Sequence, residues 1–179
     1  MNRTELEITL NKDRAWLLET LAEMDPDRRT AGVTKSEHDP NVAWSYQDHF
    51  VHLALIEHNF EAMVRRFIAG EPNPVRVGGE QAFADLTRQQ LMAAVHAMTE
   101  EWHQLHAGKS WDDVVAVTQE ARGRTLSLIS ELSDEQLQLK IPGAPWADGT
   151  VGGVLAAHAG HGRMHYKWAK DGEAALANG

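Results

Sequence analysis

Three histidines near the carboxyl end of the chain have the spacing of one helix face. His158, His161 and His165 lie three and four residues apart, so an α-helix places their side chains on one side. Each neutral imidazole carries one hydrogen-bond donor and one acceptor, and each buried unsatisfied group costs about 1–3 kcal/mol. A divalent metal ion binds several imidazole nitrogens at once. The spacing therefore favours a metal site, with a satisfied core or interface cluster as the alternative.

The pair His161 and His165 has the i, i+4 spacing found in zinc proteases. In those proteins a glutamate follows the first histidine and acts as the general base. Here Gly162 follows His161, so the protease motif is absent. A metal site on this helix therefore needs a third ligand from another element.

A second stretch, which begins at Ser45, offers three further histidines. His49 lies nearest the middle of its apolar face, and His52, three residues further on, lies toward the flank of that face. His58 falls on the opposite side and is expected to face solvent. Helical periodicity slightly prefers His49 but leaves both His49 and His52 open as ligands.

The elements that must position these residues all have helical periodicity. Apolar residues recur at spacings of three and four, which forms an apolar stripe along one face of a helix. Serines and threonines in capping positions precede several of these stripes. The expected helices are 6–24, 45–70, 87–108, 110–132 and 150–170. The expected loops are 25–43, 70–85 and 133–149.

This pattern predicts an all-α fold, because no stretch alternates long enough for a strand. We expect a four-helix bundle with crossover connections, in which 87–108 is an extra helix before the third bundle helix. One domain over residues 1–172 and a short flexible tail over 173–179 are expected.

Composition excludes several classes of function. The chain has 179 residues, a net charge of −9 and no cysteine, which argues against a nucleic-acid or anionic-membrane surface and excludes disulfides and thiol nucleophiles. It shows neither a signal peptide nor an apolar run long enough to span a membrane. A cytoplasmic protein with a small-molecule substrate and no nucleic-acid or membrane partner is expected.

Three segments, taken in order, resemble the DinB-like family. Trp44, Asp48, His52 and Leu53 match the start of that family's second helix, and His161 to His165 stands in place of its H-x-x-x-H. The segment 110–137 is similar to the third helix and its exit. The resemblance covers nearly the whole chain.

The resemblance implies a four-helix bundle with His52, His161 and His165 as a three-histidine metal site. It makes His49 and His158 neighbours of the ligands. Three imidazoles suit Zn²⁺ or Ni²⁺ and leave a position open, where the ion could acidify a water molecule or a thiol.

The implied activity is that of a thiol-dependent S-transferase or a hydrolase acting on a small molecule, in a protein that forms a homodimer. Because the chain has no cysteine, the thiol must be a low-molecular-weight cosubstrate. His165, Tyr166 and Trp168 also resemble the final helix of a related branch of detoxifying four-helix proteins. A metal-free small-molecule-binding protein and a non-catalytic dimer are therefore the alternatives.

Three charged residues near these histidines have two interpretations each. Asp48 is expected to cap its helix rather than to orient His52, and Glu57 to be a flank residue rather than a general base. Arg163 is expected to form a surface salt bridge rather than to bind an anionic substrate. No catalytic residue is assigned.

Overall fold

The computed structural model describes residues 1–36, 39, 41–77 and 82–178. His38, expected in a loop, and part of the expected loop 70–85 lie outside these ranges. Among the helices so described, none is both long and apolar enough to cross a membrane.

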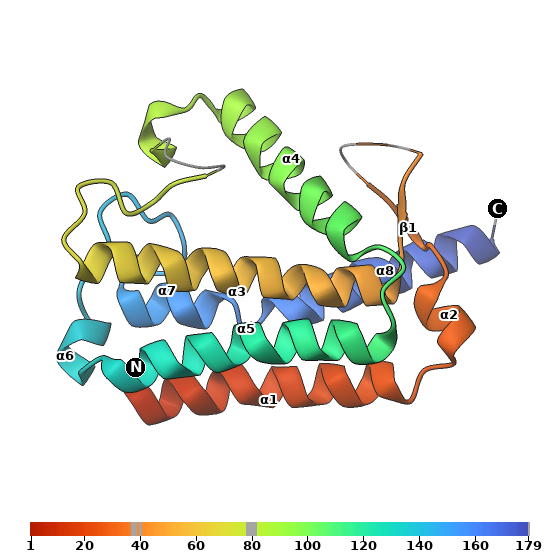
Figure 1. Cartoon of the computed structure of the whole chain (residues 1–179), viewed down its shortest axis with the longest axis horizontal. Helices are drawn as coiled ribbons and strands as arrows, with labels where there is room; N and C mark the ends of the chain where they lie inside the picture. Colours follow the sequence, from red (N-terminus) through yellow and green to blue (C-terminus); the bar gives the residue numbers. More distant parts are fainter. Residues whose placement is uncertain (37–38, 40, 78–81, 179) are drawn as a thin grey trace.

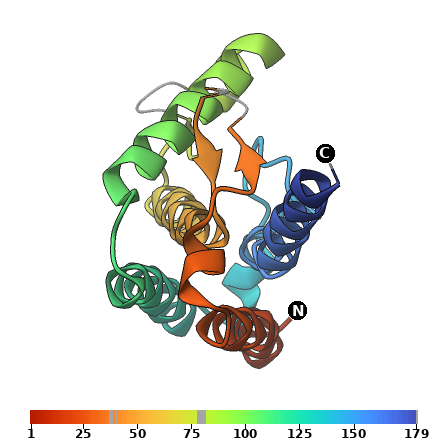
Figure 2. The same cartoon turned by 90° about the vertical axis from the view of Figure 1, so that its right-hand side faces the viewer.

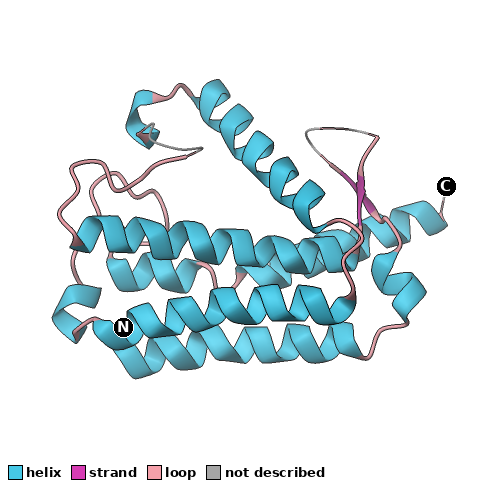
Figure 3. Ribbon diagram, viewed as in Figure 1, coloured by secondary structure: helices cyan, strands magenta, loops and turns pink. Residues whose placement is uncertain are grey.

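The chain folds into a four-helix bundle, and helices account for most of it (Figure 3). Three bundle positions are filled by α1 (Arg3–Ala22), α3 (Tyr46–Ile68) and α5 (Trp111–Glu131). The fourth is shared by α7 (Val151–Ala157) and α8 (His161–Ala177). Figures 1 and 2 show these helices running side by side along the long axis. The predicted all-α bundle is therefore confirmed.

Helix α4 (Arg88–His106) crosses the outside of the bundle at an angle, and it precedes α5 in the chain (Figure 1). It is the extra helix predicted before the third bundle helix. A short 3₁₀ turn, Phe83–Asp85, comes before it.

The predicted capping motifs form at both α3 and α4. Ser45 and Asp48 make a reciprocal capping box at the start of α3, and Thr87 and Gln90 make one at the start of α4. Each box satisfies two backbone N–H groups that the first helical turn leaves unpaired. These caps fix where each helix begins and hence which side chains face inward.

The segment 25–43, expected as a loop, contains regular structure. Asp25 caps the short helix α2 (Pro26–Thr30), which has proline in its first turn. The strands β1 (Thr34–Lys35) and β2 (Ala43–Trp44) then pair antiparallel. Each strand has two residues, which is too short for alternation of polar and apolar residues to reveal it. In the expected loop 133–149, Asp134–Leu137 forms the short helix α6.

The last helix, predicted as one element, is broken between α7 and α8. Ala157 ends α7, and the amide of His161 donates to the carbonyl of His158 at 3.1 Å, a tighter i to i−3 turn. Gly160 precedes α8 without a side-chain cap, and glycine weakens a helix.

Helix α8 extends further than expected, so the predicted tail is helical as far as Ala177. Glu173 accepts hydrogen bonds from Arg28 at 2.6 and 2.7 Å and from the Tyr46 hydroxyl at 2.8 Å. These bonds tie the end of α8 to α2 and α3.

Two apolar clusters fill the bundle, one toward each end. The first includes Leu6, Leu10, Phe60, Val64, Ile129, Leu137, Val154 and Leu155. The second includes Leu17, Leu21, Tyr46, Phe50, Leu53 and Val114.

Candidate metal centre

The three histidines that the resemblance implied come together between α3 and α8. His52 lies on α3, while His161 and His165 lie one turn apart at the start of α8. One ring nitrogen from each residue lies within 4.8 Å of the other two. The ring centroids of His52 and His161 lie 6.3 Å apart, and each lies 4.8 Å from that of His165. This group could hold a metal ion.

Local sequence explains why α8 approaches α3 so closely. Gly162 sits between the two histidines of α8, and a Cβ there would lie 3.0 Å from Leu17 Cδ2 and 3.3 Å from Leu53 Cδ1. Glycine therefore lets the backbone of α8 pack directly on α1 and α3. The close packing brings His161 and His165 to His52.

The environment keeps the three imidazoles neutral. Burial lowers the pKa of His52 to about 3 and that of His161 to about 4, and it holds the pKa of His165 far below its usual range. Neutral imidazole is the form that binds metals. The Nδ1 atom of His52 is buried and has no hydrogen-bond partner among the described residues. Three neutral donors, one of them with an unsatisfied nitrogen, fit a divalent transition metal.

The three histidines differ in burial. His52 and His165 are buried, whereas His161 is only partly buried. His161 is therefore the member of the cluster with the most solvent contact.

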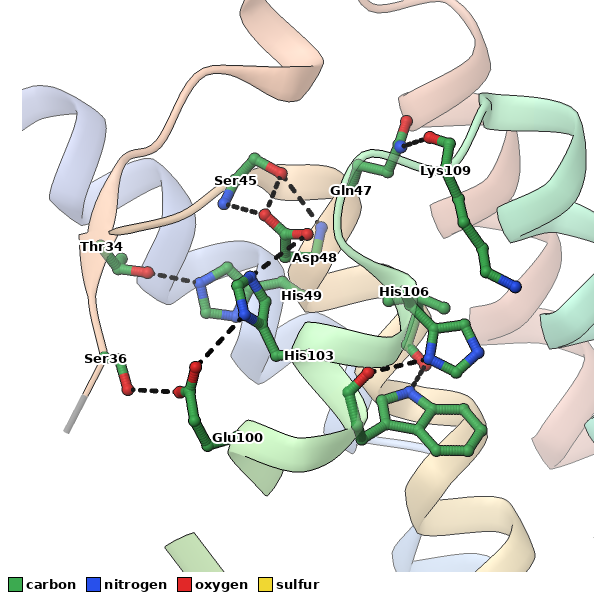
Figure 4. A network of polar contacts seen from close by, with 12 residues as sticks. Thr34, Ser36, Ser45, Gln47, Asp48, His49, Glu100, His103, His106 and Lys109 are labelled. Carbon is green, nitrogen blue, oxygen red and sulfur yellow. Dashed lines mark hydrogen bonds and ion pairs between the residues drawn. The ribbon is translucent and has the colours of Figure 1, made fainter. Parts of the chain in front are cut away.

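His49 faces inward as its periodicity predicted, but it lies behind the cluster. Its Nδ1 is 2.9 Å from Nδ1 of His165, and its Nε2 is 2.7 Å from Oγ1 of Thr34. Figure 4 shows the second of these contacts, which joins α3 to strand β1. Both ring nitrogens of His49 are therefore engaged by neighbouring side chains.

Trp44 forms an aromatic wall beside the cluster. Its ring centroid lies 5.3 Å from that of His49 and 5.4 Å from that of His52. On its other side His103 of α4 stacks nearly parallel to it, with an interplanar angle of 10°. Trp44 is thus in contact both with the cluster and with α4.

Asp48 acts as a cap, the interpretation that the sequence favoured. Its Oδ2 accepts from the backbone N–H of Ser45 at 2.8 Å and from its hydroxyl at 2.6 Å. Its Oδ1 lies 3.6 Å from Nε2 of His103 (Figure 4). This contact with Asp48 raises the pKa of His103. No hydrogen bond joins Asp48 to His52 within the part of the chain that the structure describes.

His103 and Glu100 of α4 form a contact network that the spacing of residues did not predict. Nδ1 of His103 lies 3.5 Å from Oε1 of Glu100, whose other oxygen accepts from Ser36 at 3.0 Å. These contacts hold α4 against the hairpin formed by β1 and β2 and against the start of α3 (Figure 4). The i, i+3 spacing of Glu100 and His103 was visible in the sequence, but the element that they face was not.

Glu57 is not the flank residue that we expected, because it is fully buried. It accepts two hydrogen bonds from Arg122, and Nε2 of His158 lies 2.8 Å from its Oε1. Burial opposes ionisation, but the bonds from His158 and Arg122 outweigh it and lower the pKa of Glu57 to about 2. A carboxylate held this way is a poor proton acceptor at neutral pH. His158, occupied by Glu57, stands outside the three-histidine group.

Arg163 forms the surface salt bridge expected of it. Its Nε donates to Oδ1 of Asp13 at 2.7 Å, and its guanidinium lies 4.3 Å from the ring centroid of Trp16. Both contacts are with α1, and Arg163 is exposed.

Comparison with known proteins supports the same fold. The sequence profile of the DinB superfamily matches residues 9–169. The crystal structure of an uncharacterised protein from Escherichia coli UTI89 is similar, with 20% identity and a TM-score of 0.56. The similarity covers 95% of this chain and 94% of that one. Comparison with curated proteins gives no match.

Proposed function

The chain belongs to the DinB superfamily, and on that premise we propose that it is a metal-dependent enzyme acting on a small molecule. The observation that carries the proposal is the group formed by His52, His161 and His165, whose nitrogens lie within 4.8 Å of one another. Their lowered pKa values leave each ring neutral, with one unprotonated nitrogen, at neutral pH.

Zn²⁺ or Ni²⁺ suits three imidazole nitrogens and keeps at least one position open for another ligand. His52, His161 and His165 would each hold such an ion through one ring nitrogen, and the rings would have to draw closer together than the 4.8 Å within which those nitrogens lie. Partly exposed His161 is the member of the group with the most solvent contact.

A divalent ion held by these residues would supply a Lewis acid that lowers the pKa of a thiol or a water molecule. The chain itself supplies the three nitrogens and the indole ring of Trp44, which lies beside His52 and stacks on His103 of α4. It supplies no thiol, because it has no cysteine. We therefore propose transfer of an external low-molecular-weight thiol to a small electrophile, with hydrolysis as the second candidate.

The two reactions can be separated with the same protein. Zinc- and nickel-loaded protein would be incubated with glutathione or cysteine and 1-chloro-2,4-dinitrobenzene, and separately with p-nitrophenyl acetate. A transferase accelerates thioether formation, with release of chloride, above the uncatalysed rate only when metal is present. A hydrolase accelerates release of nitrophenol above the uncatalysed rate without thiol. The variant His161→Ala should lose either activity. His58→Ala should keep it, because His58 does not face solvent as expected but lies partly buried against Trp102 of α4, outside the three-histidine group. Metal loading that changes neither reaction would contradict the proposal and favour a metal-free binding protein.

A further inference from the structure

A chain of two hydrogen bonds runs from the candidate metal centre to the hairpin. Nδ1 of His165 and Nδ1 of His49 lie 2.9 Å apart, and Nε2 of His49 lies 2.7 Å from Oγ1 of Thr34. Both histidines are buried. Only Nε2 of His165 remains outside this chain, and it is the nitrogen left to face an ion.

We infer that His49 and Thr34 are positioning residues that hold His165 in the tautomer able to bind a metal. The inference rests on the proposed function, since it concerns a ligand of the proposed centre. The inference states which ring nitrogens of His165 and His49 carry a proton in the two hydrogen bonds that lead to Thr34.

Counting protons shows that the two hydrogen bonds between His165, His49 and Thr34 can run in either of two directions. If Nε2 of His165 binds an ion, the single proton of that ring lies on Nδ1 and is donated to Nδ1 of His49. His49 then carries its own proton on Nε2 and donates it to Thr34. In the reverse direction the Thr34 hydroxyl donates to His49, His49 donates to His165, and the proton on Nε2 of His165 blocks the ion.

The count requires His49 to carry one proton and not two. Its two contacts, with Nδ1 of His165 and with Oγ1 of Thr34, give its ring one accepting and one donating nitrogen, which is the pattern of a singly protonated imidazole. A doubly protonated His49 could not accept from His165. A singly protonated His49 can donate from only one nitrogen. Metal binding at Nε2 of His165 and the direction of the two hydrogen bonds therefore determine one another, as outer hydrogen bonds do for other metal-bound histidines.

The hairpin gives this chain a fixed end. Thr34 is paired in register with Trp44, whose ring packs on His49 and His52. On the other side Gly172 of α8 packs against β1, because a Cβ there would overlap the carbonyl oxygen of Val33 and lie 2.7 Å from Thr34 Cγ2. Thr34 is therefore held by the same elements that carry the candidate ligands.

The first test measures metal affinity instead of activity. Zn²⁺ dissociation constants would be obtained by competition with a chromophoric chelator for His49→Phe, which keeps a ring but removes both nitrogens. We expect affinity to fall by about 10- to 100-fold. The same change on the far side of α3, His58→Phe, should leave affinity unchanged. Thr34→Val should weaken binding, and Thr34→Ser, which keeps the hydroxyl, should restore it.

Two further measurements keep the inference testable if His49→Phe does not fold. His49→Asn retains an acceptor near the position of Nδ1 and should recover part of the lost affinity. In ¹⁵N-histidine NMR spectra of the zinc-loaded wild type, we expect the proton of His165 on Nδ1 and that of His49 on Nε2.

The results separate this inference from the proposed function. If the wild type binds no metal, the proposed function fails and the inference with it. If the wild type binds zinc but His49→Phe binds it equally well, the inference alone is overturned. A zinc-loaded His165 that carries its proton on Nε2 would overturn it too.

Discussion

Glu57 of α3 accepts two hydrogen bonds from Arg122 of α5, each 3.0 Å long, in the middle of the bundle. Only 1% of Glu57 is exposed. His158, at the end of α7, bonds to the same carboxylate, and Nη1 of Arg14 on α1 lies 3.6 Å from it. This one carboxylate therefore joins all four positions of the bundle at the point where the last helix breaks.

Replacing Glu57 by Gln should destabilise the fold by about 3–5 kcal/mol, because it leaves Arg122 and Arg14 as uncompensated buried charges. Urea unfolding followed by circular dichroism measures this. Glu131→Gln is the matched control: Glu131 pairs with Arg65, but its side chain is 51% exposed, and its loss should have little effect on stability. Equal effects of the two substitutions would contradict the structural role of Glu57.

Substitution of Gly172 tests whether strand β1 packs closely against α8. Gly172→Ala should destabilise the fold by about 1–3 kcal/mol, since the new methyl group meets the backbone of Val33 and packed backbone cannot yield cheaply. Gly123, inside α5, has nothing within 4 Å of its Cβ position. Gly123→Ala should therefore stabilise the protein by about 0.5–1 kcal/mol. Unfolding midpoints that shift in the same direction would contradict the close contact.

Substitution of Asp48 distinguishes a role in capping α3 from a role at the metal site. Asp48→Ala should lower the free energy of unfolding by about 1 kcal/mol, as loss of a helix cap does. Zinc affinity should change by less than about threefold, because Asp48 contacts Ser45 and His103 instead of His52. Chelator competition checks this. A loss of affinity as large as that expected for His49→Phe would show that Asp48 acts on the ligands.

Stability of the metal-free protein should fall on acidification. Folding lowers the pKa of His49 to about 4, that of His52 to about 3 and that of His161 to about 4, from 6.5. Below pH 6.5 the unfolded chain therefore binds more protons than the folded one. The stability that these histidines contribute is complete above pH 6.5 and is lost as the pH falls, by roughly 1 kcal/mol per pH unit for each.

Urea unfolding at about pH 7.5 and about pH 5 measures this change. His103 opposes it, because contact with Asp48 raises its pKa, so its contribution is present at low pH and lost as the pH rises. His103→Gln should steepen the fall. Equal free energies of unfolding at the two pH values would contradict burial of the neutral histidines.

Much of the fold follows from local signals in the sequence. The apolar stripes and the capping residues Ser45 and Thr87 predict where the long helices lie, because these effects act within one or two turns. The same periodicity places His161 and His165 on one face and turns His49 inward.

The rest depends on contacts between distant elements. Helical periodicity left His49 and His52 open as ligands, because the choice depends on how α8 packs against α3. Glu57 was misplaced because Arg122 and His158, its partners, lie far away in the sequence. The hairpin that brings Thr34 to His49 was missed because two-residue strands carry no periodicity.

The zinc content of the protein tests the three-histidine centre most directly. Protein purified without a histidine tag would be loaded with excess Zn²⁺, desalted and analysed by mass spectrometry of its metals. We predict about one ion per chain for the wild type and for His58→Ala, and less than about 0.2 for His161→Ala. A wild type with less than about 0.2 ions per chain, or a His161→Ala variant that retains as much zinc as the wild type, would contradict the proposed centre.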